Sequence, residues 1–287
     1  FECKDNEQPD WQKAAALLAA TRPFCVISGG PGTGKTTTVV KILAMLLEIS
    51  ANQPLSIALA APTGKAAARL KAAITKAKGD LPCDQEIVAR IPEDVRTLHR
   101  LLGSVRNSPM FRHNAKNPLP YDVVVVDEAS MVDLPMMAKL VLALPEHARL
   151  ILLGDKNQLS SVEAGAVLGD ICQTGTETAY SKQMQATLGP YLGLNDAAFG
   201  SAEQTGPGDS LVTLQKNYRF DASSGVGRLS LAVNAGHTET SIAILNDPAA
   251  SDVNWLECPA DNQVRESLRK LVLDGFTPYL KATCAAE

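Results

Sequence analysis

Residues 29–36 carry the clearest chemical signal in the sequence, because they read GGPGTGKT and match the pattern G-x-x-x-x-G-K-[ST]. The glycines let the backbone curl so that successive N–H groups point at phosphate oxygens. The Lys35 ammonium can neutralise the terminal phosphates of a nucleotide, and the Thr36 hydroxyl can bind Mg²⁺. We expect the nucleotide to contact Gly30, Pro31, Gly32, Thr33, Gly34, Lys35, Thr36 and Thr37.

Two adjacent acids, Asp127 and Glu128, directly follow four valines at residues 123–126. We predict that Asp127 holds Mg²⁺ through water, and that Glu128 orients and deprotonates the attacking water. A simple helix cap is the alternative reading, which a run of buried valines leading into the acids makes less favourable. Gln158 follows the next apolar run and is a candidate to sense the γ-phosphate or that water, although alone it would be a surface residue.

Apolar runs of strand length alternate with helical patterns through the first half of the chain. The expected strands cover residues 24–28, 55–60, 121–127 and 149–154, and the expected helices cover residues 35–49 and 65–78. The strands are continuously apolar rather than alternating, which indicates burial on both faces. The sequence therefore predicts an α/β fold, with a parallel sheet between helices.

Three later stretches depart from this alternation. Within an expected first domain, 1–173, residues 79–120 are irregular apart from a short helix near 97–102, and we interpret them as a small inserted subdomain. Residues 174–210 are rich in Gly, Ser, Thr and Gln, and predict a surface insertion or mobile linker. A strand at 211–214 is expected to begin a second region, 211–287.

The charge is unevenly distributed along the chain. The formal net charge is −4, yet residues 61–79 and 95–121 contain several cations and no acid. Local fields attract phosphates more than net charge does, so these stretches favour nucleic acid as a partner, with a solvated helix face and a basic loop as the alternative.

Cellular location and processing are constrained by what the sequence lacks. The six cysteines form no C-x-x-C pair, which favours reduced thiols over disulfides or a zinc site. No apolar run is long enough to span a bilayer, and the first residues do not read as a secretory signal. We expect a cytoplasmic protein without membrane contact, and, since residue 1 is not Met, a piece of a longer one.

Six blocks, taken in order, resemble superfamily 1 helicases, and in particular the RecD family, the alpha subunits of bacterial exodeoxyribonuclease V. The blocks lie at residues 29–36, 61–67, 97–103, 127–130, 154–159 and 215–219. The resemblance covers about residues 11–236. It implies a RecA-like ATPase sheet in the first domain and the start of a second RecA-like domain after about residue 210.

The resemblance also implies roles at single positions. Gln12 corresponds to the residue that reads the adenine edge of ATP, and Arg219 to the arginine that reaches the γ-phosphate like an arginine finger. Thr63 and Lys65 fall in the block that grips the backbone of a DNA strand. His99 falls in a block implicated in DNA contact and coupling, although alone it would more often be a packed helix histidine.

By resemblance, the chain is an ATP-dependent DNA helicase or translocase that uses ATP and Mg²⁺. It would move 5′ to 3′ on single-stranded DNA or duplex ends, as one subunit of a DNA-repair helicase–nuclease complex with RecB-like and RecC-like partners. A stand-alone RecD-like helicase, a P-loop ATPase switch that does not act on DNA and a non-catalytic nucleotide-holding scaffold remain open. The chain departs from the family in lacking the later helicase motifs, and it carries no carboxylate cluster of the nuclease kind.

Overall fold

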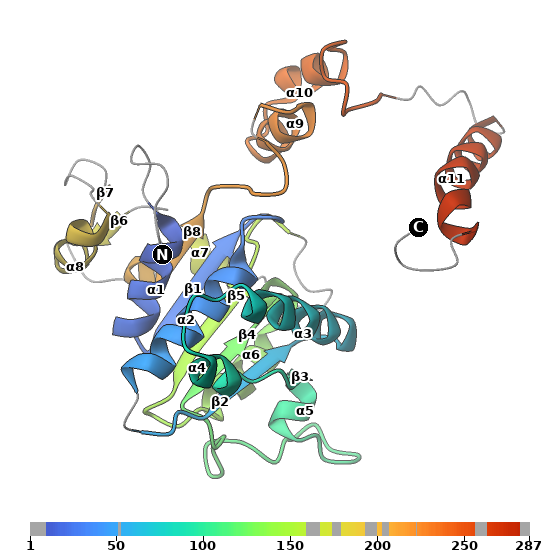
Figure 1. Ribbon diagram of the computed structural model, residues 1–287. Coiled ribbons are helices and arrows are strands. Elements are labelled where there is room, and N and C mark those ends of the chain that lie inside the picture. The colour runs from blue at the N-terminus through green and yellow to red at the C-terminus, as the bar shows by residue number, and fades with distance from the viewer. Residues whose placement is uncertain are drawn as a thin grey trace. The chain divides into compact units, whose positions relative to one another are not determined.

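The computed structural model describes residues 10–50, 53–158, 167–173, 179–192, 200–202, 207–221, 223–255 and 263–281. The chain divides into two units, Phe1–Arg219 and Phe220–Glu287, and Figure 1 labels their helices and strands. The first unit contains a six-stranded sheet, and the second is helical in its described residues.

All six strands of the large sheet are parallel, in the order β3-β2-β4-β5-β1-β8. The strands are β1 (Phe24–Gly29), β2 (Ile57–Ala61), β3 (Val95–Thr97), β4 (Val123–Val126), β5 (Arg149–Gly154) and β8 (Leu211–Leu214). Val26 of β1 pairs with Leu152 on one side and with Leu211 on the other. The α/β fold with a parallel sheet is thereby confirmed.

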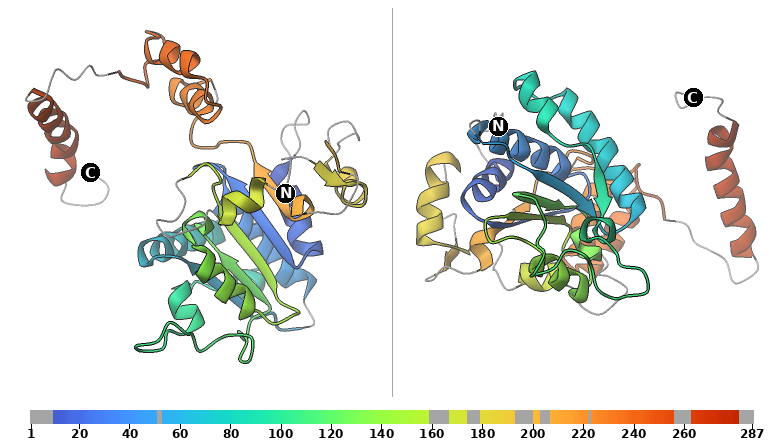
Figure 2. Two further views of the ribbon diagram at one scale, coloured as in Figure 1. Left: turned by 180° about the vertical axis from the view of Figure 1, so that it is seen from behind. Right: turned by 90° about the horizontal axis from the view of Figure 1, so that it is seen from below.

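Helices cover both faces of the sheet (Figure 2). As a result, side chains that alternate along each strand are buried in two hydrophobic clusters on opposite sides of the sheet. In β1, Ile27 packs into one hydrophobic cluster and Val26 into the other. The first cluster contains residues of α1 (Trp11–Thr21), α2 (Lys35–Ile49), α3 (Gly64–Gly79), α4 (Gln85–Arg90) and α8 (Lys182–Leu192). The second contains residues of α5 (Leu98–Leu102), α6 (Leu134–Leu142), α7 (Val167–Gln173) and the 3₁₀ helix η1 (Ala129–Met131).

The prediction of a small inserted subdomain at residues 79–120 is wrong in part. Val95–Thr97 forms β3, which extends the main sheet by pairing with Leu59–Ala61 of β2. α4 and α5 flank this strand, and Ile91 and Leu98 are buried in the two hydrophobic clusters of the sheet. The stretch therefore belongs to the first domain's core, apart from the loop after α5.

The place expected for the strand at residues 211–214 also needs correction. β8 forms as expected, but it pairs in parallel with β1 and completes the first sheet instead of opening a second region. The boundary between the two units falls later, after Arg219. A pattern of apolar residues identifies a strand but not the strand with which it pairs.

Residues 174–210 are more than a linker in their described parts. β6 (Ala179–Ser181) pairs with β7 (Gly200–Ala202), α8 follows β6, and the 3₁₀ helix η3 (Pro207–Ser210) leads into β8. Tyr180, Met184 and Leu188 are buried in the cluster that contains α1 and α2. Asp209 accepts hydrogen bonds from the Ser181 backbone N–H at 2.8 Å and from its hydroxyl at 2.7 Å.

In the second unit, the described residues form α9 (Gly225–Asn234), α10 (Thr238–Leu245) and α11 (Gln263–Lys281). The Asp252 carboxylate accepts the N–H groups of Gly225 and Val226, both at 2.9 Å, and so fixes the start of α9. Arg228 pairs with Asp247 at 2.9 Å. A second RecA-like sheet stays a prediction. No helix among the described residues has both the length and the apolar character needed to cross a membrane.

Candidate active site

The six sequence blocks meet at one edge of the sheet. Because all six strands are parallel, their carboxyl ends lie at the same edge, where α/β proteins bind ligands. One block begins at the last residue of each strand or directly after it: residues 29–36 at β1, 61–67 at β2, 97–103 at β3, 127–130 at β4, 154–159 at β5 and 215–219 at β8. Residues that are far apart in the chain are thereby positioned around a common edge.

The phosphate-binding loop turns through two glycines with left-handed backbone angles. Gly32 has φ +85° and Gly34 has φ +83°, a region that residues with a Cβ atom rarely adopt. The Thr33 hydroxyl donates to the Gly30 carbonyl at 2.9 Å and closes the turn. The loop then enters α2 at Lys35, as its sequence predicts.

The N-terminus of α2 differs from those of neighbouring helices. Asp10 caps α1, Thr63 caps α3 and Asp133 caps α6, each through a side-chain oxygen that accepts a backbone N–H. α2 begins at Gly34 without such a cap and without an acid in its first turn. The N–H groups and the positive end of the helix dipole at this point are therefore available to an anion.

Lys35 lies where it can neutralise an anion at this helix end. Its ammonium donates to the carbonyl oxygen of Gly29 and, at 3.1 Å, to that of Gly30. Burial lowers the pKa of Lys35, and the negative charges of Asp155, Asp127 and Glu128 act in the opposite direction. The three carboxylates therefore favour the charged ammonium that phosphate binding requires.

Asp127 is a largely buried carboxyl group at the end of β4. Burial raises its pKa, and the Glu128 backbone N–H opposes this shift by donating to Asp127 Oδ1 at 2.9 Å. Asp127 forms no ion pair with any residue that the structure describes. The charges of Lys35 and Arg69 lower the pKa of Asp127 but act less strongly than burial. A largely buried carboxylate at this strand end can serve as a ligand to a cation.

Glu128 is held in an unusual backbone conformation, with φ +52° and ψ +40°. A residue with a Cβ atom in this left-handed region costs about 1–2 kcal/mol, and such strain is concentrated at functional sites. The Glu128 carboxylate lies 3.7 Å from the guanidinium of Arg69 on α3, a residue that we did not single out from the sequence.

Asp155 is the second site residue that sequence reasoning missed. It directly follows β5, the residue is 4% exposed, and its charge is the strongest of those that raise the pKa of Lys35. Its position at a strand end, like that of Asp127, was an available signal. Gln158 lies in the exposed turn that follows, where its N–H donates to the Asp155 carbonyl at 3.1 Å. Its predicted sensing role stays a prediction.

The block after β8 lies against the phosphate-binding loop. The Asn217 side chain donates to the Pro31 carbonyl at 3.0 Å, and the Tyr218 N–H donates to the Gly32 carbonyl at 2.8 Å. A Cβ atom built on Gly32 would lie 2.6 Å from that of Arg219. The structure therefore brings the backbone and Cβ atom of Arg219 to the loop, and its action on the γ-phosphate stays a prediction.

Gln12 also reaches the loop. Its side-chain nitrogen would lie 2.9 Å from a Cβ atom built on Gly34, so the first turn of α1 sits beside the start of α2. Asp10 fixes that turn, because its carboxylate accepts the N–H groups of Gln12 and Lys13 at 3.0 and 3.1 Å. This position is compatible with the adenine-reading role implied by the resemblance.

The candidate DNA-contact residues lie on two other helices at the same edge of the sheet. Thr63 caps α3 by accepting the Ala66 N–H at 3.2 Å, and Lys65 is exposed in the first turn of that helix. His99 is exposed on α5 and meets the Phe111 ring edge to face, with ring centroids 5.7 Å apart. Thr63 and Lys65 thus lie together at the start of α3, whereas His99 lines a separate pocket.

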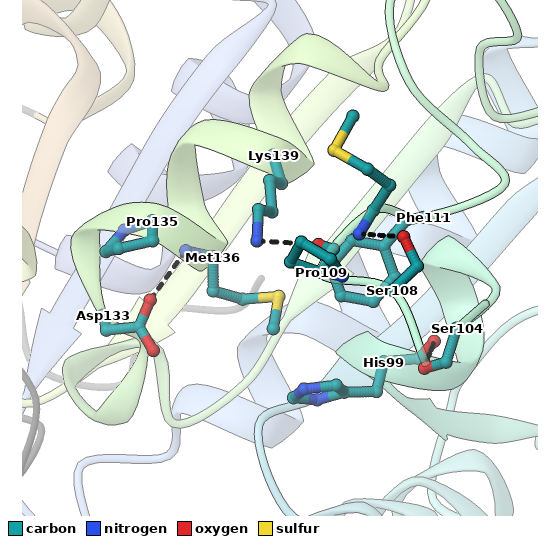
Figure 3. A pocket seen from close by; sticks show the side chains of 10 residues that line it. His99, Ser104, Ser108, Pro109, Phe111, Asp133, Pro135, Met136 and Lys139 are labelled. Carbon is teal, nitrogen blue, oxygen red and sulfur yellow. Dashed lines mark hydrogen bonds between the residues drawn. The ribbon is translucent and has the colours of Figure 1, made fainter. Parts of the chain in front are cut away.

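The pocket beside His99 has a volume of about 320 Å³ and lies between the loop after α5 and the start of α6 (Figure 3). The Lys139 ammonium lies 5.4 Å from the centre of the Phe111 ring and donates to the Pro109 carbonyl at 3.1 Å. The lining consists of His99, Ser104, Ser108, Pro109, Met110, Phe111, Asp133, Pro135, Met136 and Lys139. Aromatic, apolar and cationic groups together suit a nucleobase and its phosphate.

A glycine-rich loop between strand and helix, an acid pair on a separate strand and a parallel sheet with these sites at one edge define a P-loop NTPase. A family model described as an AAA domain matches residues 12–164, more than half of the sequence. The chain belongs to this AAA domain family.

Proteins with similar sequences support the expected resemblance to RecD. The chain is 43% identical over 96% of its length to the RecBCD enzyme subunit RecD of Haemophilus influenzae. It is 40% identical over 89% of its length to the subunit of the same name in Mycolicibacterium smegmatis, and 36% identical over 72% to the ATP-dependent RecD2 DNA helicase of Deinococcus radiodurans. It spans 43%, 40% and 26% of these three relatives, respectively.

Proposed function

We propose that the protein is an ATP-dependent DNA helicase or translocase motor of the RecD type. The observation that carries the proposal is the arrangement at one edge of the sheet. At this edge lie the uncapped start of α2, the acids after β4 and the Arg219 segment. The helices that carry Thr63, Lys65 and His99 begin at the same edge. A nucleotide site close to a DNA-binding surface allows closure around the nucleotide to alter the grip on DNA.

The residues present fit ATP and Mg²⁺. A Cβ atom on Gly30 would meet nothing within 4 Å, so the loop leaves room for phosphate beside the free N–H groups of α2. Mg²⁺ is commonly held by one or two carboxylates together with phosphate oxygens and water. Asp127 at the end of β4 and Thr36 in the first turn of α2 can supply such a site.

We propose the following roles for the site residues, which rest on the motifs and on the resemblance to RecD. Lys35 neutralises the terminal phosphates, and Asp127 and Thr36 hold Mg²⁺, which withdraws charge from the phosphate oxygens when bound. Glu128 orients the attacking water and accepts its proton. Gln158 and Arg219 respond to the γ-phosphate, and Gln12 contacts the adenine.

DNA binding is assigned to the basic surface at the same edge. Thr63 and Lys65 hold the phosphates of a single strand, and His99 contributes at the pocket beside α6. Binding and hydrolysis of ATP change this grip and so move the protein along the strand. A 5′ to 3′ direction rests entirely on the resemblance to RecD.

RecB-like and RecC-like subunits are the proposed partners, because the relatives with 40–43% identity are named as subunits of the RecBCD enzyme. The complex would act on duplex DNA ends in the cytoplasm. A stand-alone helicase is the second candidate, since a relative with 36% identity is named as the RecD2 helicase. Size-exclusion chromatography of the protein with and without RecB-like and RecC-like subunits from the same source separates these two possibilities.

The proposed activity is tested by the rate of ATP hydrolysis with and without single-stranded DNA. We expect hydrolysis that requires Mg²⁺ and is stimulated several-fold by an oligonucleotide of arbitrary sequence, because phosphate contacts carry little sequence information. Hydrolysis that is indifferent to DNA would favour a P-loop ATPase switch over a DNA motor.

A further inference from the structure

Arg69 connects the basic helix with the catalytic acid. Its guanidinium Nη1 lies 3.7 Å from Glu128 Oε1, and its side chain is 70% exposed, whereas that of Glu128 is 21% exposed. This ion pair links a solvent-facing cation on α3 to the residue that, under the proposed function, accepts a proton from the attacking water.

The position of Arg69 on α3 places it near the assigned DNA grip. Lys65 and Arg69 are four residues apart, so they share one face of the helix, with Cβ atoms roughly 6 Å apart. Both side chains are exposed, and Thr63 fixes the start of the helix by capping it. A DNA strand that Lys65 holds through a phosphate therefore passes within reach of Arg69.

The ion pair is weak enough to exchange. At 3.7 Å the two groups are beyond hydrogen-bonding distance, and the guanidinium side of the pair is open to solvent, so the contact contributes little stability. A guanidinium forms stronger, paired hydrogen bonds with a phosphate than it makes in this contact. An arriving DNA phosphate can therefore draw Arg69 away from Glu128.

The Glu128 backbone is fixed in the left-handed region and η1 begins directly after it, so the carboxylate can move only by rotation of its side chain. The charge of Arg69 is also felt by the rest of the site. Burial is the main cause of the lowered pKa of Lys35 and of the raised pKa of Asp127, and Arg69 lowers the pKa of both groups.

From this geometry we infer that Arg69 is a DNA-sensing positioning residue, which holds the Glu128 carboxylate away from the attacking water until a DNA phosphate displaces the guanidinium. The inference rests on the proposed function and adds to it a specific route by which DNA stimulates hydrolysis. Arg69 acts through Glu128 and is not itself a catalytic residue.

The test compares Arg69→Ala with the wild type and with Lys76→Ala, which removes one exposed cation from the far end of the same helix. ATP hydrolysis is measured without DNA and at saturating single-stranded DNA. At saturation, a change in the affinity for DNA does not affect the measured rate. We expect the rate of Arg69→Ala without DNA to rise about two- to fivefold, the range that corresponds to the loss of an exposed ion pair. Its rate with DNA should match that of the wild type, so the stimulation ratio falls by the same factor.

Two further measurements separate this role from a structural one. Arg69→Lys keeps the charge and should retain part of the wild-type stimulation ratio, whereas Lys76→Ala should retain all of it. Raising the salt from about 50 to 200 mM without DNA should increase the wild-type rate towards that of Arg69→Ala, because salt screens the exposed pair.

The outcomes distinguish this inference from the proposed function. A wild type that is stimulated by DNA, together with an Arg69→Ala variant of unchanged ratio, would overturn the inference and leave the motor function standing. A fall in the DNA-free rate of Arg69→Ala would also overturn it, since Arg69 would then assist Glu128. A wild-type rate that does not respond to DNA would instead count against the motor function, and with it against DNA sensing by Arg69.

Discussion

Replacing Gly32 with alanine tests how closely the Arg219 segment is seated on the phosphate-binding loop. The new Cβ atom would lie 2.6 Å from the Cβ atom of Arg219 and 2.7 Å from the Asn217 side-chain oxygen. These distances are too short for stable contacts, so residues 217–219 must move away from the loop. The backbone at Gly32, with φ +85°, also disfavours alanine.

The expected loss of stability follows from these two effects. A residue with a Cβ atom in the left-handed region costs about 1–2 kcal/mol. Moving the segment breaks the hydrogen bonds from Asn217 to Pro31 and from Tyr218 to Gly32, each worth about 0.5–1.5 kcal/mol. The sum is about 2–5 kcal/mol, and the exposed setting of the segment places the expected value near the lower end.

Gly30→Ala is the matched control, since Gly30 lies in the same loop, has no positive φ and has nothing within 4 Å of a Cβ atom. Urea unfolding should place this variant within about 0.5 kcal/mol of the wild type. Gly32→Ala should also hydrolyse ATP at least tenfold more slowly, because a positioned arginine finger is worth about 10³ or more. Equal stability of the two variants, or full hydrolysis by Gly32→Ala, would refute the seating of Arg219 on the loop.

Four further substitutions test the site. Lys35→Ala should weaken ATP binding and abolish turnover, measured by nucleotide titration and phosphate release; unchanged turnover would remove the loop from the site. Glu128→Gln should retain ATP binding while hydrolysis falls by about two to four orders of magnitude, and a collapse of affinity would argue that Glu128 is structural. Asp127→Asn should stop hydrolysis yet raise stability at neutral pH, because burial raises the pKa of Asp127 and the ionised form therefore opposes folding. This gain should vanish in unfolding curves recorded below the ordinary pKa of an aspartate, where both states carry the neutral acid, and a gain that persists there would contradict the cause given. Lys65→Ala should weaken DNA binding equally for all sequences and reduce the slope of log affinity against log salt by about 1, whereas an unchanged slope would exclude a phosphate contact.

The parts of the fold that could be predicted are those with strong local patterns. The four valines of β4 have no polar residue to compete with burial, and the GKT sequence determines where α2 begins. β3 escaped prediction because it has three residues, none of them fully buried, and owes its structure to pairing with β2. The position of β8 depends on β1, almost two hundred residues away in the chain, and no local pattern carries that information.

The candidate site shows the same division. Residues inside recognisable blocks, such as Lys35 and Arg219, could be assigned from sequence, and the structure brings both to the loop. Asp155 could have been found by the rule that applied to Asp127, since both follow buried strands. The pairing of Arg69 with Glu128 could not, because it joins one of several similar cations on α3 to an acid on another element.

The seating of residues 217–218 on the phosphate-binding loop has a mechanical consequence. These residues stand between β8 and the point where the second unit begins, so tension on the chain beyond Arg219 reaches them first. The hydrogen bonds from Asn217 to Pro31 and from Tyr218 to Gly32 hold them on the loop, whereas β8 is joined to β1 along four register pairs. Under such a force, residues 217–218 should detach from the phosphate-binding loop, and the affinity of the loop for nucleotide should fall, before β8 separates from β1. An opposing force in an optical trap should therefore shorten the residence time of bound nucleotide while the first unit stays folded.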